Sequence, residues 1–159
     1  MDSIKEMQFG VANREQIQGL TGTEYLEGMM AGRFPAPPIA KVLQFRLVEI
    51  GKGTAIFTGV PVFDFYNPLG SVHGGYAATL LDSCMGCSIH TTLPAGMAYT
   101  TLEIKVNFVR ALTHETGPIR AEGKVLTSGK RVATAEGRLL DEKGILYAHG
   151  TTTCLVFPV

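Results

Sequence analysis

The sequence predicts an α+β fold in which one antiparallel sheet curls around one central apolar helix. Residues 101–110 alternate apolar and polar side chains, which is typical of a half-buried antiparallel strand. Residues 76–92 are rich in Ala, Leu, Met and Cys on nearly all sides, so we expect a buried helix there. The 159 residues show no strand–helix–strand alternation, which argues against a doubly wound parallel sheet.

A short helix and two strands are expected before the central helix. Residues 21–24 fit a capping box, which predicts a helix over about 23–32. The prolines within 35–38 should end that helix. Residues 42–50 and 54–60 flank a Gly-Lys-Gly turn, which predicts a β-hairpin.

Three further strands are expected after the central helix and the alternating strand. They are residues 119–127, 132–140 and 145–156. The connections at 128–131 and 141–144 contain Gly beside charged residues, which is typical of turns.

Composition excludes several classes of function. Fourteen Lys and Arg balance fourteen Asp and Glu, which argues against broad electrostatic binding to nucleic acid. No apolar run is long enough to span a membrane, and no signal peptide is evident. Three cysteines without framework spacing indicate a reducing compartment, so we expect a cytoplasmic protein. The histidines share no metal-binding spacing, so we expect no metal and no cofactor.

Two polar features of the central helix need an explanation. The helix begins with His73, Gly74 and Gly75, whose backbone N–H groups lie at the positive end of the helix dipole and are not shielded by side chains. They could bind an oxyanion or a substrate oxygen, or the glycines could simply allow close packing on the sheet. Asp82 lies within the apolar helix and needs either a function or a hydrogen bond from Ser83 or a strand threonine.

The spacing of these features bears on the oligomeric state. Nine residues separate His73 from Asp82, which is roughly 13 Å along a helix and about half a turn out of phase. One chain therefore cannot direct its Gly74 N–H and its Asp82 at the same small group. Two antiparallel copies of the helix could do so twice, so a shared site requires at least a dimer.

The chain resembles the hot-dog fold acyl-CoA thioesterases of the phenylacetate-degradation (PaaI-like) group. The resemblance covers about residues 35–157 and rests on the segment NPLGSVHGG at 67–75 with Leu-Leu-Asp at 80–82, on the strand at 101–110, on the Ser-Gly-Lys-Arg turn and on the closing His-Gly-Thr-Thr strand. It implies a hot-dog domain at 35–159, preceded by a leader with a short helix at 1–34. It also implies dimers that usually pair into tetramers.

The same resemblance implies roles for several residues. Asp82 looks like the catalytic carboxylate, acting as general base or as nucleophile, and the Gly74 N–H of the other subunit looks like the oxyanion donor. Asn67 and His73 look like residues that shape the oxyanion side and orient the thioester. Thr101 falls where the group often has a residue that positions the water.

Some assignments around the substrate stay open in the sequence. Thr100 rivals Thr101, because the preceding loop is one residue longer than usual for the group. Arg110, Lys130 and Arg131 are candidates for binding the coenzyme A phosphates, or they are solvated residues at a strand end and a turn.

We expect an acyl-CoA thioesterase that acts on an aromatic or medium-chain acyl group. The alternatives are a hot-dog dehydratase or hydratase and a non-catalytic acyl-CoA binder. The leader, with Met7, and the helix at 23–32 could cap the acyl tunnel or could be ordinary packing.

Overall fold

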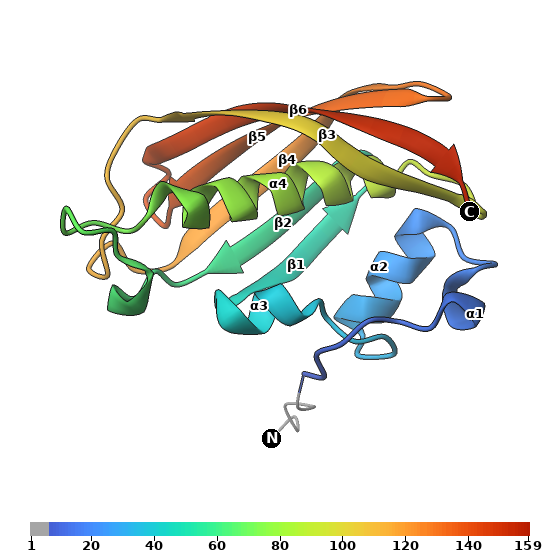
Figure 1. Cartoon of the computed structure of the whole chain (residues 1–159), viewed down its shortest axis with the longest axis horizontal. Coiled ribbons are helices and arrows are strands. Elements are labelled where there is room, and N and C mark those ends of the chain that lie inside the picture. The colour runs from blue at the N-terminus through green and yellow to red at the C-terminus, as the bar shows by residue number, and fades with distance from the viewer. Residues whose placement is uncertain (1–6) are drawn as a thin grey trace.

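The computed structural model describes residues 7–159 as one six-stranded antiparallel sheet with a long helix lying against it. The strand order is β1-β2-β4-β5-β6-β3, and helix α4 has β3 and β6 on one side and β1 and β2 on the other (Figure 1). Strands β1 and β3 are therefore the two edges of the sheet. The predicted sheet around one central helix is confirmed.

The elements follow the predicted order along the chain. The helices are α1 (Arg14–Ile17), α2 (Gly22–Met30), α3 (Pro38–Val42) and α4 (Gly74–His90), with a short 3-10 turn at Phe63–Phe65. The strands are β1 (Phe45–Gly51), β2 (Thr54–Gly59), β3 (Met97–Phe108), β4 (Ile119–Ser128), β5 (Val132–Asp141) and β6 (Leu146–Pro158).

The prediction of a strand from residue 42 was wrong at its start. Residues 38–42 form helix α3, and β1 begins only at Phe45. Pro37 is the N-cap of α3 and Pro38 its first residue, where the fixed φ of proline favours a helix and its missing N–H costs nothing. Helix α2 ends at Met30, before the first of these prolines, so the prediction that the prolines end it was wrong.

A row of small residues lets α4 lie unusually close to the sheet. Ala55, Gly123, Gly137 and Gly150 are aligned partners across β2, β4, β5 and β6. A Cβ at Gly123 would collide with the backbone carbonyl of Cys84 in α4. A Cβ at Gly137 would lie 2.9 Å from a side-chain carbon of Met85. The helix backbone thus occupies space that any larger side chain would fill.

Helix α4 is fully buried only on its sheet side. Leu80, Leu81 and Met85 are 0% exposed, whereas Asp82 and Ser83 are half-buried. The prediction of burial on nearly all sides is therefore wrong for the stripe of the helix that carries these two polar residues. The apolar face packs on the middle strands of the sheet, and the stripe lies beside edge strand β3.

The N-terminal segment docks on the C-terminal end of α4. The Thr23 hydroxyl donates to the Thr91 carbonyl over 3.0 Å, and Leu26 is 1% exposed. The His90 ring lies near the rings of Tyr25 and Tyr99, with centroids 5.6 and 5.3 Å away. The division of the chain at residue 34 stays a prediction. Within residues 7–159, no helix combines the length and hydropathy that a membrane span requires.

The close approach of helix and sheet predicts a stability difference between two glycines. Gly123→Ala should lower the free energy of unfolding by about 2–3 kcal/mol, because the new methyl group meets rigid backbone. Gly19→Ala is the matched control, since nothing lies within 4 Å of its new Cβ. Urea unfolding at one protein concentration measures both, and equal effects would contradict this account of the packing.

Burial of His90 predicts a loss of stability in acid. Desolvation lowers the pKa of His90 to about 4 in the folded protein. As the pH falls, the His90 imidazole therefore takes up a proton in the unfolded chain before it does so in the folded protein. Stability should therefore fall as pH drops from about 6.5 to about 4, by about 3 kcal/mol in total from this group. His90→Phe should remove this part of the pH dependence in urea unfolding curves, and an unchanged acid limb would exclude His90 as its cause.

Candidate active site

Asp82 and Thr101 form a hydrogen-bonded pair between the central helix and edge strand β3. The Thr101 hydroxyl donates to Asp82 Oδ1 over 2.9 Å. A β-bulge at Leu102 follows Thr101, and Leu102 itself is 58% exposed. Thr100 is exposed, so Thr101 rather than Thr100 contacts the carboxylate. The hydrogen bond from a strand threonine, which the sequence offered as an alternative to a function for Asp82, is therefore present. The same bond fixes the orientation of the carboxylate.

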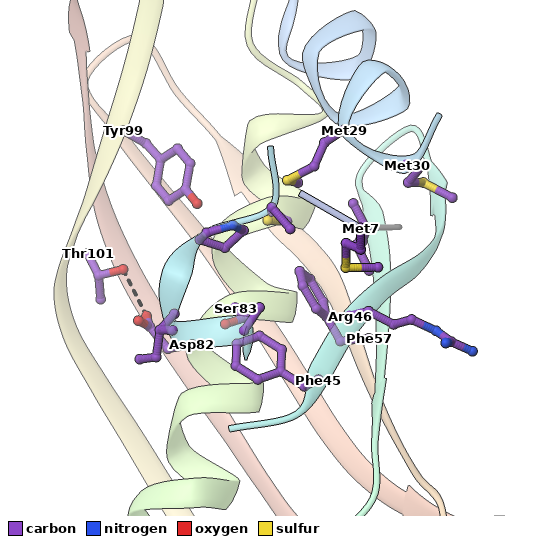
Figure 2. Close-up of a pocket in the computed structure, with 16 residues that line it drawn as sticks. Met7, Met29, Met30, Phe45, Arg46, Phe57, Asp82, Ser83, Tyr99 and Thr101 are labelled. Atoms are coloured by element: carbon purple, nitrogen blue, oxygen red, sulfur yellow. Dashed lines mark hydrogen bonds between the residues drawn. The ribbon is translucent and has the colours of Figure 1, made fainter. Parts of the chain in front are cut away.

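The pair lies at one end of a cavity of about 300 Å³ (Figure 2). Apart from the pair and Ser83, most of the lining side chains are apolar, including Phe45 and Phe57. Cys87 also lines the cavity, and burial raises the pKa of its thiol to about 12. At neutral pH this thiol is therefore protonated and a poor nucleophile.

The N-terminus of α4 presents one free backbone donor. His73 is the N-cap, and its Nδ1 accepts the Gly75 N–H over 2.8 Å. The Gly74 N–H has no recorded hydrogen-bond partner among the residues that the structure describes. The Phe108 ring lies against Gly74, since a Cβ there would be 2.9 Å from it. The capping histidine thus satisfies the second N–H and leaves the first available.

Asn67 organises the loop that leads into α4. Its Oδ1 accepts from the backbone N–H groups of Leu69 and Ser71, over 2.9 and 3.3 Å. Its Nδ2 donates to the Ser71 hydroxyl over 3.2 Å. Asn67, His73 and Gly74 line a second cavity together with Arg110. In a single chain Asn67 therefore positions the loop and the start of the helix.

The two halves of the predicted site are separate within one chain. The cavity at Asp82 and the cavity at Gly74 share no lining residue. This separation agrees with the spacing argument that one chain cannot bring both groups to one substrate. No cluster of three potential metal-binding side chains occurs among residues 7–159.

The candidate phosphate-binding residues also lie at two ends of the sheet. Arg110 follows the end of β3, with its guanidinium 6.0 Å from the Tyr147 ring centroid. Lys130 and Arg131 occupy the turn between β4 and β5, next to Val132, which aligns through β6 with Thr100 near the start of β3. One chain therefore does not bring these three side chains together.

Sequence reasoning missed several residues around the site. Tyr99, two positions before Thr101 on the strand, lines the cavity, and its ring packs on Gly86 of α4. The alternating pattern of the strand could have indicated this inward-facing position. Arg46 also lines the cavity, but only tertiary packing brings it there. Met29 and Met30 of α2 line it too, and they belong to the helix for which the sequence left open a place at the acyl tunnel or ordinary packing.

Comparison with known proteins identifies the family. The thioesterase superfamily model matches residues 69–148. The chain belongs to the thioesterase superfamily. A candidate esterase of Saccharolobus solfataricus, SSO2140, is 32% identical over 71% of this chain and 79% of its own length. The predictions of a PaaI-like hot-dog fold and of a thioester hydrolase are confirmed.

Two solved structures illustrate the similarity of this fold to known proteins. A candidate thioesterase of Ralstonia eutropha, related to phenylacetic acid degradation, has a TM-score of 0.75 and is 28% identical over 82% of this chain and 98% of its own. The smu.793 protein of Streptococcus mutans, solved bound to acetyl-CoA, has a TM-score of 0.65 and is 25% identical over 72% and 89%. The second structure connects the fold with a coenzyme A thioester.

The Asp82–Thr101 bond predicts a specific effect on thioesterase turnover. Thr101→Val should lower kcat about tenfold with little change in KM, because a hydrogen bond to a charged group is lost. Thr101→Ser should keep most of the activity. Thr100→Val, on the same strand but exposed, is the control. A thiol-release assay compares the four proteins, and equal losses in the two valine variants would exclude a special role for Thr101.

Proposed function

We propose that this thioesterase hydrolyses acyl-CoA, with Asp82 as the catalytic carboxylate and the Gly74 N–H of a second subunit as the oxyanion donor. The observation that carries the proposal is the Thr101-bound carboxylate at the end of an apolar cavity. The acetyl-CoA complex of the Streptococcus mutans protein supports a coenzyme A thioester as substrate.

The chemistry needs a polarised carbonyl and an activated nucleophile. A backbone N–H that points at the developing oxyanion typically contributes about 10²–10³ in rate. A positioned carboxylate contributes about 10²–10⁴ when it acts as general base. The departing thiol has a pKa of only about 8.5 and leaves readily as thiolate, so no strong acid is needed. Asp82 could equally attack the carbonyl itself, with water then cleaving the anhydride.

Edge strand β3 offers a way to join the two half-sites. Antiparallel pairing of two β3 strands about a two-fold axis at Lys105 would set Ile104 opposite Val106 of the partner subunit, and both side chains pack against the core in their own chains. Because the bulge adds one residue at Leu102, the same register would set Thr101 opposite Phe108 of the partner subunit. Phe108 lies against Gly74 in each chain, so this register carries Gly74 of one subunit toward Asp82 of the other.

Charges on the outer face of β3 suit the same register. Glu103 and Lys105 are exposed, and the two-fold axis would set the two Lys105 side chains opposite each other, with each Lys105 also diagonal to Glu103 of the partner subunit, whose opposite charge offsets the repulsion between the two cations. The pairing would also bring Arg110 of the partner subunit to the end of the sheet that carries Lys130 and Arg131. These cations and the partner's Arg110 together could bind the phosphates of one coenzyme A.

A subunit-mixing experiment tests the composite site. Asp82→Asn should abolish thiol release, because the amide cannot act as base or nucleophile. Gly74→Pro should also abolish it, because proline removes the N–H at the first position of the helix, whereas Gly74→Ala, which sets a Cβ against the Phe108 ring but keeps the N–H, controls for the added bulk. Co-refolding equal amounts of the two inactive chains should restore about a quarter of wild-type activity, since half of the dimers are mixed and each carries one intact site.

Two outcomes would contradict the proposal. No restored activity, while the mixed oligomers form, would place both groups in sites within one chain. Near-wild-type turnover by the Asp82→Asn variant would remove Asp82 from the mechanism. Two further measurements on the wild-type protein distinguish the alternatives. Loss of enoyl-CoA absorbance without thiol release would indicate a hydratase. Tight binding of acyl-CoA without turnover would indicate a binding protein.

A further inference from the structure

Three methionines from the N-terminal segment form the far wall of the cavity that contains Asp82. Met7, Met29 and Met30 line it, although they lie more than fifty residues away from Asp82 in the sequence. Figure 2 shows the three methionines on one side and the Asp82–Thr101 pair on the other. An acyl group attached to a thioester at Asp82 would therefore extend toward these methionines.

The wall is held in place by contacts outside the cavity. Helix α2, which carries Met29 and Met30, is fixed to the end of α4 by the Gly22 N–H donating to the Leu93 carbonyl over 3.0 Å, and by buried Leu26. Near the C-terminus of α2, the Phe34 ring packs directly on Gly28. The methionines of α2 thus project from a docked helix rather than from a loose tail.

A short bridge positions the third methionine. Phe9 and Ala36 form a parallel β-bridge, with Gly10 N–H donating to the Ala36 carbonyl over 2.9 Å and Ala36 N–H donating to the Gln8 carbonyl over 2.8 Å. Met7 directly precedes this bridge, and Ala36 itself lines the cavity. Residues 8–10 are therefore tied to the cavity rim by two backbone hydrogen bonds.

The chemistry of the cavity changes from one end to the other. Asp82, Ser83 and Thr101 lie at the reacting end. Phe45 and Phe57 lie between this end and the methionines, and the Arg46 guanidinium points away from Asp82. The methionine side chains thus offer thioether and hydrocarbon surface, and the Tyr99 hydroxyl and the Cys87 thiol are the other polar side-chain groups of the lining besides Arg46. Methionine is flexible and polarisable, so such a wall adapts to apolar groups of different shape.

We propose that Met7, Met29 and Met30 bind the far end of the acyl group and select apolar acyl chains of medium length. The inference rests on the proposed acyl-CoA hydrolysis and names the substrate class of that site. A hydroxyl at the far end of an acyl group would lose its water without gaining a hydrogen bond from the methionine side chains, so hydroxylated aryl acyl groups should be disfavoured. The N-terminal segment is then a specificity element of the enzyme.

The test compares kcat/KM over saturated acyl-CoA esters from acetyl to dodecanoyl, with phenylacetyl-CoA and its ring-hydroxylated analogue. For wild type, kcat/KM should rise about fourfold per added methylene until the cavity is filled. The phenylacetyl ester should exceed its hydroxylated analogue by about tenfold or more. Equal or better hydrolysis of the hydroxylated ester would overturn the selection for apolar ends.

Variants of the wall separate binding at the far end from the chemistry. Met29→Trp should shift the optimum to shorter chains by filling the cavity, and the double variant Met29→Ala with Met30→Ala should flatten the rise with chain length. Both should hydrolyse acetyl-CoA within about twofold of wild type, since an acetyl group is too short to reach the wall. Glu27→Ala, exposed on the same helix and outside the cavity lining, is the matched control.

A binding measurement makes failure of this inference distinguishable from failure of the proposed function. Calorimetric titration of the Asp82→Asn variant with the same esters should show that Kd depends on chain length. Adding Met29→Ala and Met30→Ala to this variant should flatten that dependence. If wild type hydrolyses the esters but the wall variants keep its chain-length profile, the methionine wall is wrong. If no ester is hydrolysed while the length-dependent binding persists, the proposed function is wrong and the wall stands.

Discussion

The close contact between helix α4 and the sheet is the constraint on which the rest of the structure depends. Gly123 leaves room for the backbone of Cys84, and Gly137, its partner on the adjacent strand, leaves room for the side chain of Met85. Because the helix sits so deep, its sheet side is excluded from water and must be apolar. Asp82 lies only two residues before Cys84, and it escapes burial because the helical rotation turns it to the half-buried stripe. The short distance between helix and sheet thus also fixes where the Asp82 carboxylate lies relative to β3.

The strand beside Asp82 is shaped to meet it. Without the bulge at Leu102, the inward-facing positions on both sides of it could not all face the helix, because strand side chains alternate between the two faces. With the bulge, Tyr99 and Thr101 face α4 before it, and Ile104 and Val106 pack on the core after it. The bulge therefore serves the hydrogen bond to Asp82 and the register of the exposed edge at once.

The periodicity of apolar residues was enough to predict the elements whose side chains follow one regular pattern along their length. The strand at 101–110 and the helix at 76–92 were found within a few residues, since their apolar patterns are long. The glycine row was not visible, because its members lie in different strands and are aligned only by the pairing register. Of the site, the spacing of Gly74 and Asp82 was readable from helical geometry alone. The methionine wall depends on docking of α2 over more than fifty residues, which no local pattern encodes.

Edge strand β3 connects stability with catalysis. An unpaired edge is a template for other strands, and Leu102 and Val109 expose 58% and 56% of their surface on or just beyond it. In the proposed pairing of two β3 strands, a slip by one residue would set inward-facing side chains opposite outward-facing ones, so burial of Ile104 and Val106 would resist slippage. The same slip would move Gly74 of one subunit by about 3.3 Å relative to Asp82 of the other. A hydrogen bond to an oxyanion tolerates far less, so the apolar contacts that define the pairing register would also define the geometry of the shared site.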